Sequence, residues 1–408
     1  MSLPITDEQR RTLLTLMFAA FASQASIRLC DSMLPQLADD FGGAVTDAAG
    51  VVTAFTVAYG LFQLFYGPLG DRFGKLPVVT VATLAAAIGS LACAFAPGLG
   101  ALTGLRFATG AACAALIPLS LAWIGDSVEY EHRQRTLARF LTGSTSGLIF
   151  GQIAGGAFAD TLGWRLGFGV LAAVLAIVTG ALVLRLRAQA GASQAQVRAA
   201  VSQPASTGAG RFSTALIARQ FAGVLSLPWA RAMLCFVFFE GAVVFGATAF
   251  IPTYLHLGFE MPLWKAGVVV AGFGAGGLAY ALGSAWLIPR LGERGLVCAG
   301  GLFFALAVAT IGSADLARET IKCFFAGAGF FMLHNTLQTL ATQMAPRARG
   351  TAISAFAFGL FAGQSAGVAL AAVLVAQVGF PALFVGSGLL VAALAATVYA
   401  AISRRARA

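Results

Sequence analysis

The chain has 408 residues, of which 59% are hydrophobic and only 10% are charged, and its formal net charge is +10. So little polar surface excludes a soluble protein of this size and predicts an integral membrane protein. The positive charge does not indicate a nucleic-acid partner, because the basic residues are spread over the short connections between apolar runs.

The apolar runs are about twenty residues long, which predicts membrane-spanning helices and excludes a barrel of alternating strands of about ten residues. The polar start, Met1 to Arg10, leads into a run too long for a cleavable signal, so we expect the first span to stay. We predict an all-α integral membrane fold of twelve transmembrane helices in two six-helix bundles. The expected spans are residues 12–38, 46–69, 77–96, 99–125, 137–160, 165–186, 232–257, 264–288, 295–313, 316–343, 351–376 and 380–402.

Lysine and arginine are distributed unequally over the connections between these spans. With the N-terminus placed inside, 20 basic residues fall on inner segments and 4 on outer ones, while Arg28 and Arg106 remain within spans. Inner loops of membrane proteins carry the excess of basic residues. We therefore expect a multi-pass protein of the cell inner membrane with both termini in the cytoplasm.

The spans divide the chain into an N-terminal bundle (residues 1–187), a cytoplasmic linker (residues 188–230) and a C-terminal bundle (residues 231–408). Residues 188–210 are rich in Ala, Gln, Ser and Gly without apolar periodicity, which predicts a flexible tether. Apolar residues then recur near helical spacing over residues 212–225, which indicates a short helix lying on the inner leaflet.

Glycines four residues apart recur in both halves of the chain. Gly147-Leu-Ile-Phe-Gly-Gln-Ile-Ala-Gly returns as Gly359-Leu-Phe-Ala-Gly-Gln-Ser-Ala-Gly, a shift of 212 positions (359 − 147), which indicates a duplication. Such glycines give a helix a flat strip that another helix can approach closely. The predicted packing motif consists of Gly147, Gly151, Gln152, Gly155 and Gly156 and of Gly359, Gly363, Gln364 and Gly367.

Charged and polar side chains inside the spans are costly in hydrocarbon unless they are paired or face water, so we expect them to line an internal cavity. Arg28 and Asp31 are three residues apart and share a helix face, so they can neutralise each other. The remaining candidates are Gln24, Tyr59, Gln63 and Arg106 in the first half and Glu240, His334, Asn335 and Gln338 in the second.

Nothing in the sequence predicts a metal site or a cofactor. Pairs such as Met332 with His334 and Met233 with Cys235 are two residues apart, which puts them on different helix faces. No CxxC spacing, nucleophile elbow, Walker-type phosphate loop or pair of catalytic carboxylates occurs, so we expect a protein that is not an enzyme and is not driven directly by ATP.

Three motifs carry a resemblance to a known family. The loop after the second span contains Gly67, Asp71, Arg72, Gly74 and Lys75, and it resembles the loop between the second and third helices of the major facilitator superfamily. Leu102-x3-Arg106-x2-Thr109-Gly110 is similar to the fourth-helix motif of that superfamily, with Thr109 in place of Gln. The stretch from Gly147 to Gly156 resembles the fifth-helix motif of its antiporters, with Gln152 in place of Pro.

The resemblance implies a secondary active transporter of the twelve-helix drug and metabolite proton antiporter branch. It implies alternating access, a role of Arg106 in proton coupling, a small-molecule substrate bound between two bundles at mid-membrane, and a gate formed by the loop motif with Asp71. We expect efflux in exchange for protons by a monomer in the lipid bilayer. The alternative is proton-coupled uptake of a small organic anion, motivated by the two arginines in spans and by Gln152. A receptor or scaffold with the same fold would be expected to carry an additional folded domain.

Within this framework we predict that Asp31 takes up and releases the proton, with Arg28 and Arg106 tuning it and Glu240 as the competing acid. The alternative for the first-half charges is a purely structural ion pair that fastens the first helix to the fourth.

Overall fold

Helices make up almost all of the computed structural model, which describes residues 6–199, 214–345 and 349–405. No strand occurs within these ranges. The prediction of an all-α fold is therefore confirmed.

The first half of the chain, residues 7–199, is called the N-half below. Its helices are α1 (Asp7–Arg28), the 3₁₀ turn η1 (Asp31–Met33), α2 (Leu34–Phe41), α3 (Val45–Ala48), α4 (Gly50–Phe73), α5 (Lys75–Ala94), α6 (Leu99–Cys113), α7 (Leu116–Ser127), α8 (Tyr130–Asp160) and α9 (Trp164–Ala199). The C-half, residues 214–405, contains α10 (Thr214–Leu225), α11 (Pro228–Thr248), α12 (Ile251–Phe259), α13 (Leu263–Ala309), α14 (Leu316–Ala341) and α15 (Arg349–Arg405).

Eight helical segments of the described ranges are long and apolar enough to cross a membrane. Two of them, within α13 and α15, bend at Gly292 (φ 59°) and Gly379 (φ 79°), in a backbone region that favours glycine. Helices α8 and α14 are not among the eight, since polar side chains lower their hydropathy. The number of twelve spans remains a prediction.

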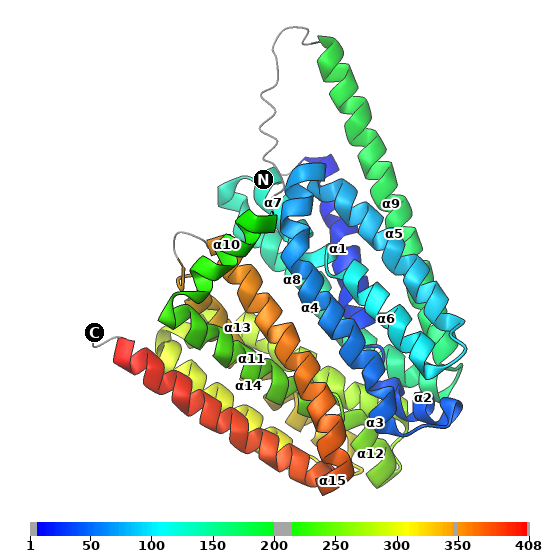
Figure 1. Cartoon of the computed structure of the whole chain (residues 1–408), viewed down its shortest axis with the longest axis vertical. Helices are drawn as coiled ribbons and strands as arrows, with labels where there is room; N and C mark the ends of the chain where they lie inside the picture. Colours follow the sequence, from blue (N-terminus) through cyan, green and yellow to red (C-terminus); the bar gives the residue numbers. More distant parts are fainter. Residues whose placement is uncertain (1–5, 200–213, 346–348, 406–408) are drawn as a thin grey trace.

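The segment after the sixth predicted span differs from the expected tether. Helix α9 continues to Ala199 and projects beyond the neighbouring helices (Figure 1). Alanine and glutamine are strong helix formers, so a segment without an apolar face can still extend a helix that is already nucleated. The rest of the tether, residues 200–213, lies outside the described residues. The short helix expected after it is present as α10, and its position at the inner leaflet stays a prediction.

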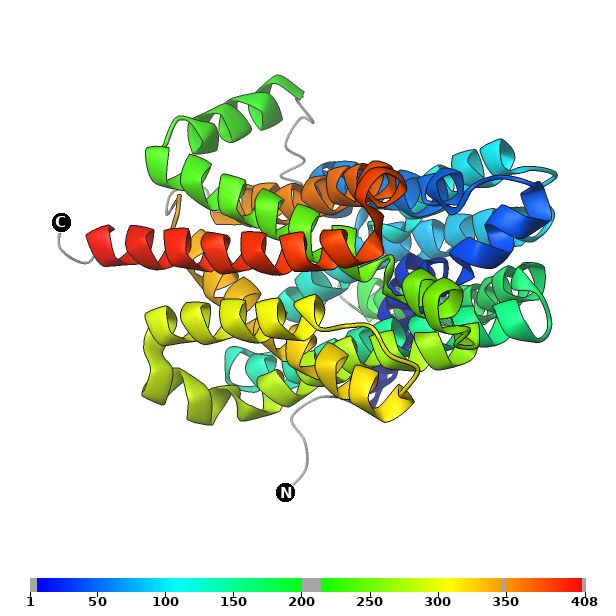
Figure 2. The same cartoon turned by 90° about the horizontal axis from the view of Figure 1, so that it is seen from below.

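The two halves lie side by side in both views (Figure 1 and Figure 2). One large cluster of buried apolar side chains draws mainly on residues 13–182 and a second on residues 224–402. The halves contact each other near the end that carries α3 and α12, where α15 contacts α3 and α12 contacts η1. We call this the α3/α12 end.

Most glycines of the two predicted strips pack against a helix of their own half, whereas Gly156 lies against the backbone of Leu263 in the other half. In the N-half, Gly147, Gly151 and Gly155 of α8 lie against the backbones of Phe21, Ala25 and Leu29 in α1. In the C-half, Gly363 and Gly367 lie against Phe238 and Ala242 of α11. The equivalent of Gly147 is therefore Gly363, a shift of 216 positions (363 − 147) and one helical turn away from the alignment at 212. Because the glycines recur every four residues, the two stretches also match when one is displaced by four residues, so the sequence alone does not distinguish the two alignments.

Candidate functional site

Asp31 lies where the first span is interrupted. Helix α1 ends at Arg28, η1 follows from Asp31, and Pro35 stands in the first turn of α2, where proline needs no hydrogen-bond donor. The interruption places the Asp31 carboxyl inside the bundle, with the residue only 1% exposed. A buried carboxylate needs partners, because desolvating it costs several kcal/mol.

Two side chains hold one oxygen of this carboxyl. Arg28 Nη1 lies 3.3 Å from Asp31 Oδ2, and Gln152 of α8 donates its amide N–H to the same oxygen at 2.9 Å. The second oxygen, Oδ1, is buried without a hydrogen-bond partner among the described residues. The predicted pairing of Arg28 with Asp31 is present, and the structure adds Gln152, which the sequence suggested only for helix packing.

Gln152 links this carboxyl to the boundary between the halves. Its side chain bonds to Asp31, while its backbone carbonyl lies directly against Gly267 of α13 in the C-half. Ser32 also donates to the Gln152 carbonyl at 3.2 Å. A displacement of Gln152 would therefore change contacts in both halves.

Arg106 of α6 is fully buried and donates to Ser26 of α1 rather than to Asp31. Its Nη2 lies 2.9 Å from the Ser26 carbonyl, and its Nη1 lies 3.2 Å from the Ser26 hydroxyl. The guanidinium also covers the ring of Phe55 at 3.9 Å. The tie between the first and fourth predicted spans is thus a hydrogen-bonded arginine, not an ion pair.

A second buried acid lies in the C-half. Glu240 of α11 is 0% exposed, and its Oε2 lies 2.8 Å from His334 Nδ1 of α14. Its Oε1 has no hydrogen-bond partner among the described residues. The His334 ring stacks on Phe330 at 5.1 Å between ring centres and lies 5.5 Å from Phe356. Glu240 and His334, predicted separately, therefore form one unit.

A row of aromatic rings connects the two acids. Arg28 lies 4.4 Å above the ring of Phe245. Phe245 packs against Phe330 at 5.1 Å, and Phe330 stacks on His334. The partners of the two acids, Arg28 and His334, thus contact the same row of aromatic rings, although the acids belong to different halves.

A cavity of about 540 Å³ lies between α8 of the N-half and helices α13 and α14 of the C-half. It is lined on one side by Thr142 and Thr145 and on the other by residues that include the predicted Asn335 and Gln338. Both threonines lie in the first half of α8, away from the α3/α12 end. Of the other predicted cavity residues, Tyr59 is buried and packs on Phe361 at 4.7 Å, whereas Gln24 and Gln63 are half-buried.

The halves meet closely where the end of α8 reaches the start of α13, toward the α3/α12 end. Gly156 of α8 lies against the backbone of Leu263, and the Trp264 N–H at the start of α13 donates to Asp160 Oδ2 at 2.7 Å. Negative charge at a helix N-terminus is favourable, so Asp160 of one half stabilises a helix of the other.

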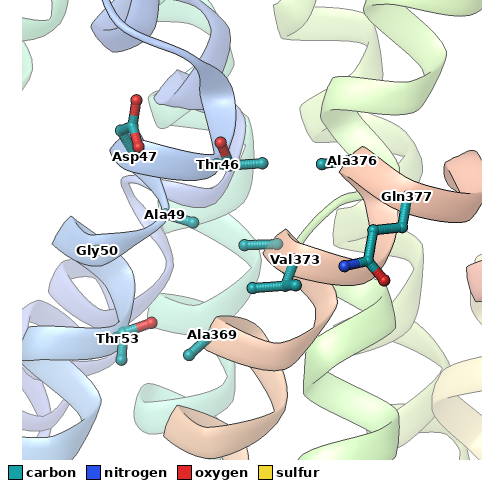
Figure 3. Close-up of a pocket in the computed structure, with 10 residues that line it drawn as sticks. Thr46, Asp47, Ala49, Gly50, Thr53, Ala369, Val373, Ala376 and Gln377 are labelled. Carbon is teal, nitrogen blue, oxygen red and sulfur yellow. The ribbon is translucent and has the colours of Figure 1, made fainter.

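A second contact between the halves is made by α4 of the N-half and α15 of the C-half. Thr56 and Ser365 share a hydrogen bond of 2.8 Å. Beside it, a cavity of about 450 Å³ separates Thr46 to Thr53 from Ala369 to Gln377 (Figure 3). Because Thr46 belongs to α3, this cavity lies at the α3/α12 end, where the halves are separated between α3 and α15 but tightly packed between α8 and α13.

The inner-loop motif forms a charged cluster within the N-half. Lys75 contacts Asp126 of α7, and its Nζ lies 3.6 Å from Asp71 Oδ1. The Asp71 side chain is 74% exposed, and Arg72 covers Phe73 at 5.1 Å. Gly74 (φ 88°) permits the turn between α4 and α5, while Gly67 lies within α4. Asp126 is a partner that the sequence did not predict.

Comparison with known proteins agrees with this architecture. A family model described as Major Facilitator Superfamily matches residues 16–368. The chain is 24% identical to the uncharacterized MFS-type transporter YceJ of Bacillus subtilis, over 92% of each chain. It is 30% identical to the multidrug export protein EmrB of Haemophilus influenzae over 37% of this chain and 30% of the other. Among solved structures, the nucleoside transporter NupG aligns with a TM-score of 0.75 at 14% identity, over 97% of this chain and 99% of the other.

Proposed function

This chain belongs to the major facilitator superfamily and is a membrane transporter of small substrates, not an enzyme; we propose that it exports a small organic molecule across the cell inner membrane in exchange for protons. The local similarity to a multidrug export protein supports efflux. The basic residues of the sequence support the inner membrane with both termini in the cytoplasm. The transporter acts as a monomer and needs no cofactor.

The transport unit has twelve spans in two bundles, residues 1–187 and 231–408, joined by residues 188–230. The bends at Gly292 and Gly379 support this count, since each can divide one long helix into two crossings. The cavity of about 540 Å³ at one end and the close packing of α8 against α13 at the other support a state that opens toward the cytoplasm along these helices, whereas a second cavity of about 450 Å³ separates α3 from α15 at the α3/α12 end. Alternation would close the cavity of about 540 Å³ and separate the α3/α12 end.

One observation carries the proposed proton coupling: the side chain of Gln152 holds Asp31 while its backbone abuts Gly267 of the other half. A proton on Asp31 removes the charge that Arg28 and Gln152 both contact. The Gln152 amide is then held less tightly, and the packing of α8 against α13 changes. Protonation thereby biases the equilibrium between the two open states. The inner-loop residues Asp71, Arg72 and Lys75 form a gating cluster at the cytoplasmic end, which is opposite the α3/α12 end.

The alternative, proton-coupled uptake of an organic anion, would need a cationic side chain free to bind the substrate. Arg28 already contacts Asp31 and Phe245, and Arg106 already contacts Ser26 and Phe55. Both guanidinium groups are buried. These contacts favour exchange over anion uptake.

A transport experiment separates the two directions. A thermal-shift screen of purified protein against metabolites and drugs supplies a substrate, which is then followed in vesicles of known orientation. Antiport predicts that an imposed proton gradient drives substrate against the direction of proton flow. Movement of substrate in the same direction as the protons would establish uptake and contradict the proposal.

A further inference from the structure

We propose that a groove between α11 and the two arms of α15 binds one acyl chain of a membrane phospholipid. The arms are residues 349–378 and 380–405, which meet at the bend of Gly379 and are orange and red in Figure 1. We call this site the α15 groove. The inference depends on the membrane location of the chain and not on the direction of transport or on proton coupling.

The α15 groove has a volume of about 250 Å³, and small residues of three helical segments form its walls. These residues include Ala242 and Gly246 of α11, Gly367 and Ala371 of the first arm, and Ala382 and Gly386 of the second arm. A Cβ added at Gly386 would meet no atom within 4 Å, so open space lies beside this backbone. The groove can therefore accept a slender ligand without a movement of its walls.

The lining of the α15 groove offers no polar group to a ligand. Among the described residues that line it, none is charged and only Ser387 has a polar side chain. The Ser387 hydroxyl already donates to the Val243 carbonyl at 2.9 Å. Apolar cavities exclude water, and one of about 150 Å³ accepts benzene instead. The chemistry of this lining thus favours hydrocarbon over water or a polar substrate.

The rim of the α15 groove shows where the hydrocarbon comes from. Leu370, Val378 and Leu390 line the groove and are 59%, 56% and 58% exposed. Exposed aliphatic side chains on the spans of a multi-pass membrane protein face lipid tails, so the groove is continuous with the lipid-facing surface. A tail that enters gains van der Waals contacts with walls that would otherwise border a void. Phospholipid acyl chains are therefore the occupant that the location supplies.

The first arm of α15 separates this groove from the boundary between the halves. The groove is lined by its residues Gly367, Leu370, Ala371, Leu374 and Val378. The cavity of about 450 Å³ beside α3 is lined by Ala369, Ala372, Val373, Ala376 and Gln377. Since successive helical residues are about 100° apart, the two sets lie on opposite faces of the arm. An acyl chain in the α15 groove thus fills the space behind the wall of the cavity between the halves.

The test is photolabelling of the full-length protein in vesicles that contain a phosphatidylcholine with a diazirine in one acyl chain. Adducts are mapped by mass spectrometry at Ala247 and Ala371, which line the groove and are only 1% and 2% exposed. Their yield is compared with that at Ile88, an exposed side chain of α5. The wild type is expected to give adducts at both alanines, although other lipids around the protein cannot reach them.

The variant Gly386→Leu places an aliphatic side chain in the groove, so it should lower the yield at both alanines about tenfold or more and leave Ile88 unchanged. Gly180→Leu is the matched control. Gly180 is an exposed glycine of α9 whose added Cβ meets no atom within 4 Å, and its substitution should leave all three yields unchanged. Gly386→Ala adds a single methyl group and should give a smaller loss, which decides the question if Gly386→Leu does not fold.

Absence of adducts at both alanines in the wild type, or equal yields in the wild type and the folded Gly386 variants, would overturn the assignment. A yield at the alanines that rises when the protein is diluted in the bilayer would show that a second copy covers the groove, and would also overturn it. Because the measurement uses neither substrate nor gradient, its failure leaves the proposed proton exchange standing.

Discussion

The close approach of α8 and α13 predicts that Gly156→Ala shifts the transporter toward the state with a separated α3/α12 end. A Cβ added at Gly156 would lie 2.5 Å from the Leu263 carbonyl carbon and 2.9 Å from Trp264 Cα. Carbon atoms pack at about 3.5 Å, so the two backbones must separate by about 1 Å. The nearest atoms belong to the other half, so the strain is relieved when the halves separate.

The magnitude follows from the cost of overpacking. One extra methyl group in a tightly packed contact costs about 1–3 kcal/mol. If separation of the halves relieves all of it, the population of the separated state rises about 5-fold to 150-fold. The stability of each half against unfolding should change little, because the contact lies between them.

The assay is the labelling rate of a cysteine placed at Ser365, on a background without the six native cysteines. Ser365 is 3% exposed and bonds to Thr56 across the halves, so its label reports their separation. When opening is fast, the labelling rate follows the population of the open state. Gly104→Ala is the control, since a Cβ there meets no atom within 4 Å. An unchanged or slower rate in folded Gly156→Ala protein would refute the reasoning.

Three further predictions concern the same cycle. Asp160→Ala removes the carboxylate that accepts from the Trp264 N–H. A lost helix cap costs roughly 0.5–2 kcal/mol, so the labelling rate at Ser365 should rise about 2-fold to 30-fold. A rate like that of the exposed control Asp39→Ala would contradict this prediction. Asp71→Asn should slow turnover more than it weakens substrate binding, because Asp71 contacts the gating lysine Lys75; wild-type turnover in correctly inserted protein would remove Asp71 from the gate. A cysteine introduced at Ser193 should react with an impermeant reagent only from the cytoplasmic side, and labelling in intact cells would reverse the topology.

Composition and hydropathy were sufficient to predict the helical membrane fold, because bilayer thickness requires long apolar runs. The pairing of Arg28 with Asp31 was also predictable from their separation of three residues, because the turn between α1 and η1 still brings the two side chains together. The packing of the glycine strips followed from their spacing. Their alignment between halves did not, because a four-residue repeat fits equally well after a shift of one turn.

Contacts between distant segments could not be predicted in the same way. Gln152 bonds to an acid 121 residues away, and Glu240 pairs with a histidine 94 residues away. The sequence marks each as a polar residue in an apolar span, which suggests a partner without naming it. Nothing in the sequence indicated the contact between Phe245 and Arg28, because phenylalanine is common in membrane helices.

Helix α9 illustrates a different limit. Residues 188–199 lack an apolar face and were expected to form part of a tether, yet they continue the preceding helix. Periodicity reports only the burial of a helix face. It gives no information on a helix that continues beyond its packed part on the strength of its intrinsic propensity.

The most direct test of the account is substrate transport by Asp31→Asn in vesicles with an imposed proton gradient. Asparagine keeps the size of the side chain and a hydrogen-bond acceptor for Gln152, but it carries no exchangeable charge. Gradient-driven transport is expected to be abolished, while substrate binding stays measurable and no longer depends on pH. Glu240→Asp, measured beside it, should keep a response to the gradient. Gradient-driven transport that survives in Asp31→Asn would contradict the central claim and reduce Asp31 to a structural partner of Arg28.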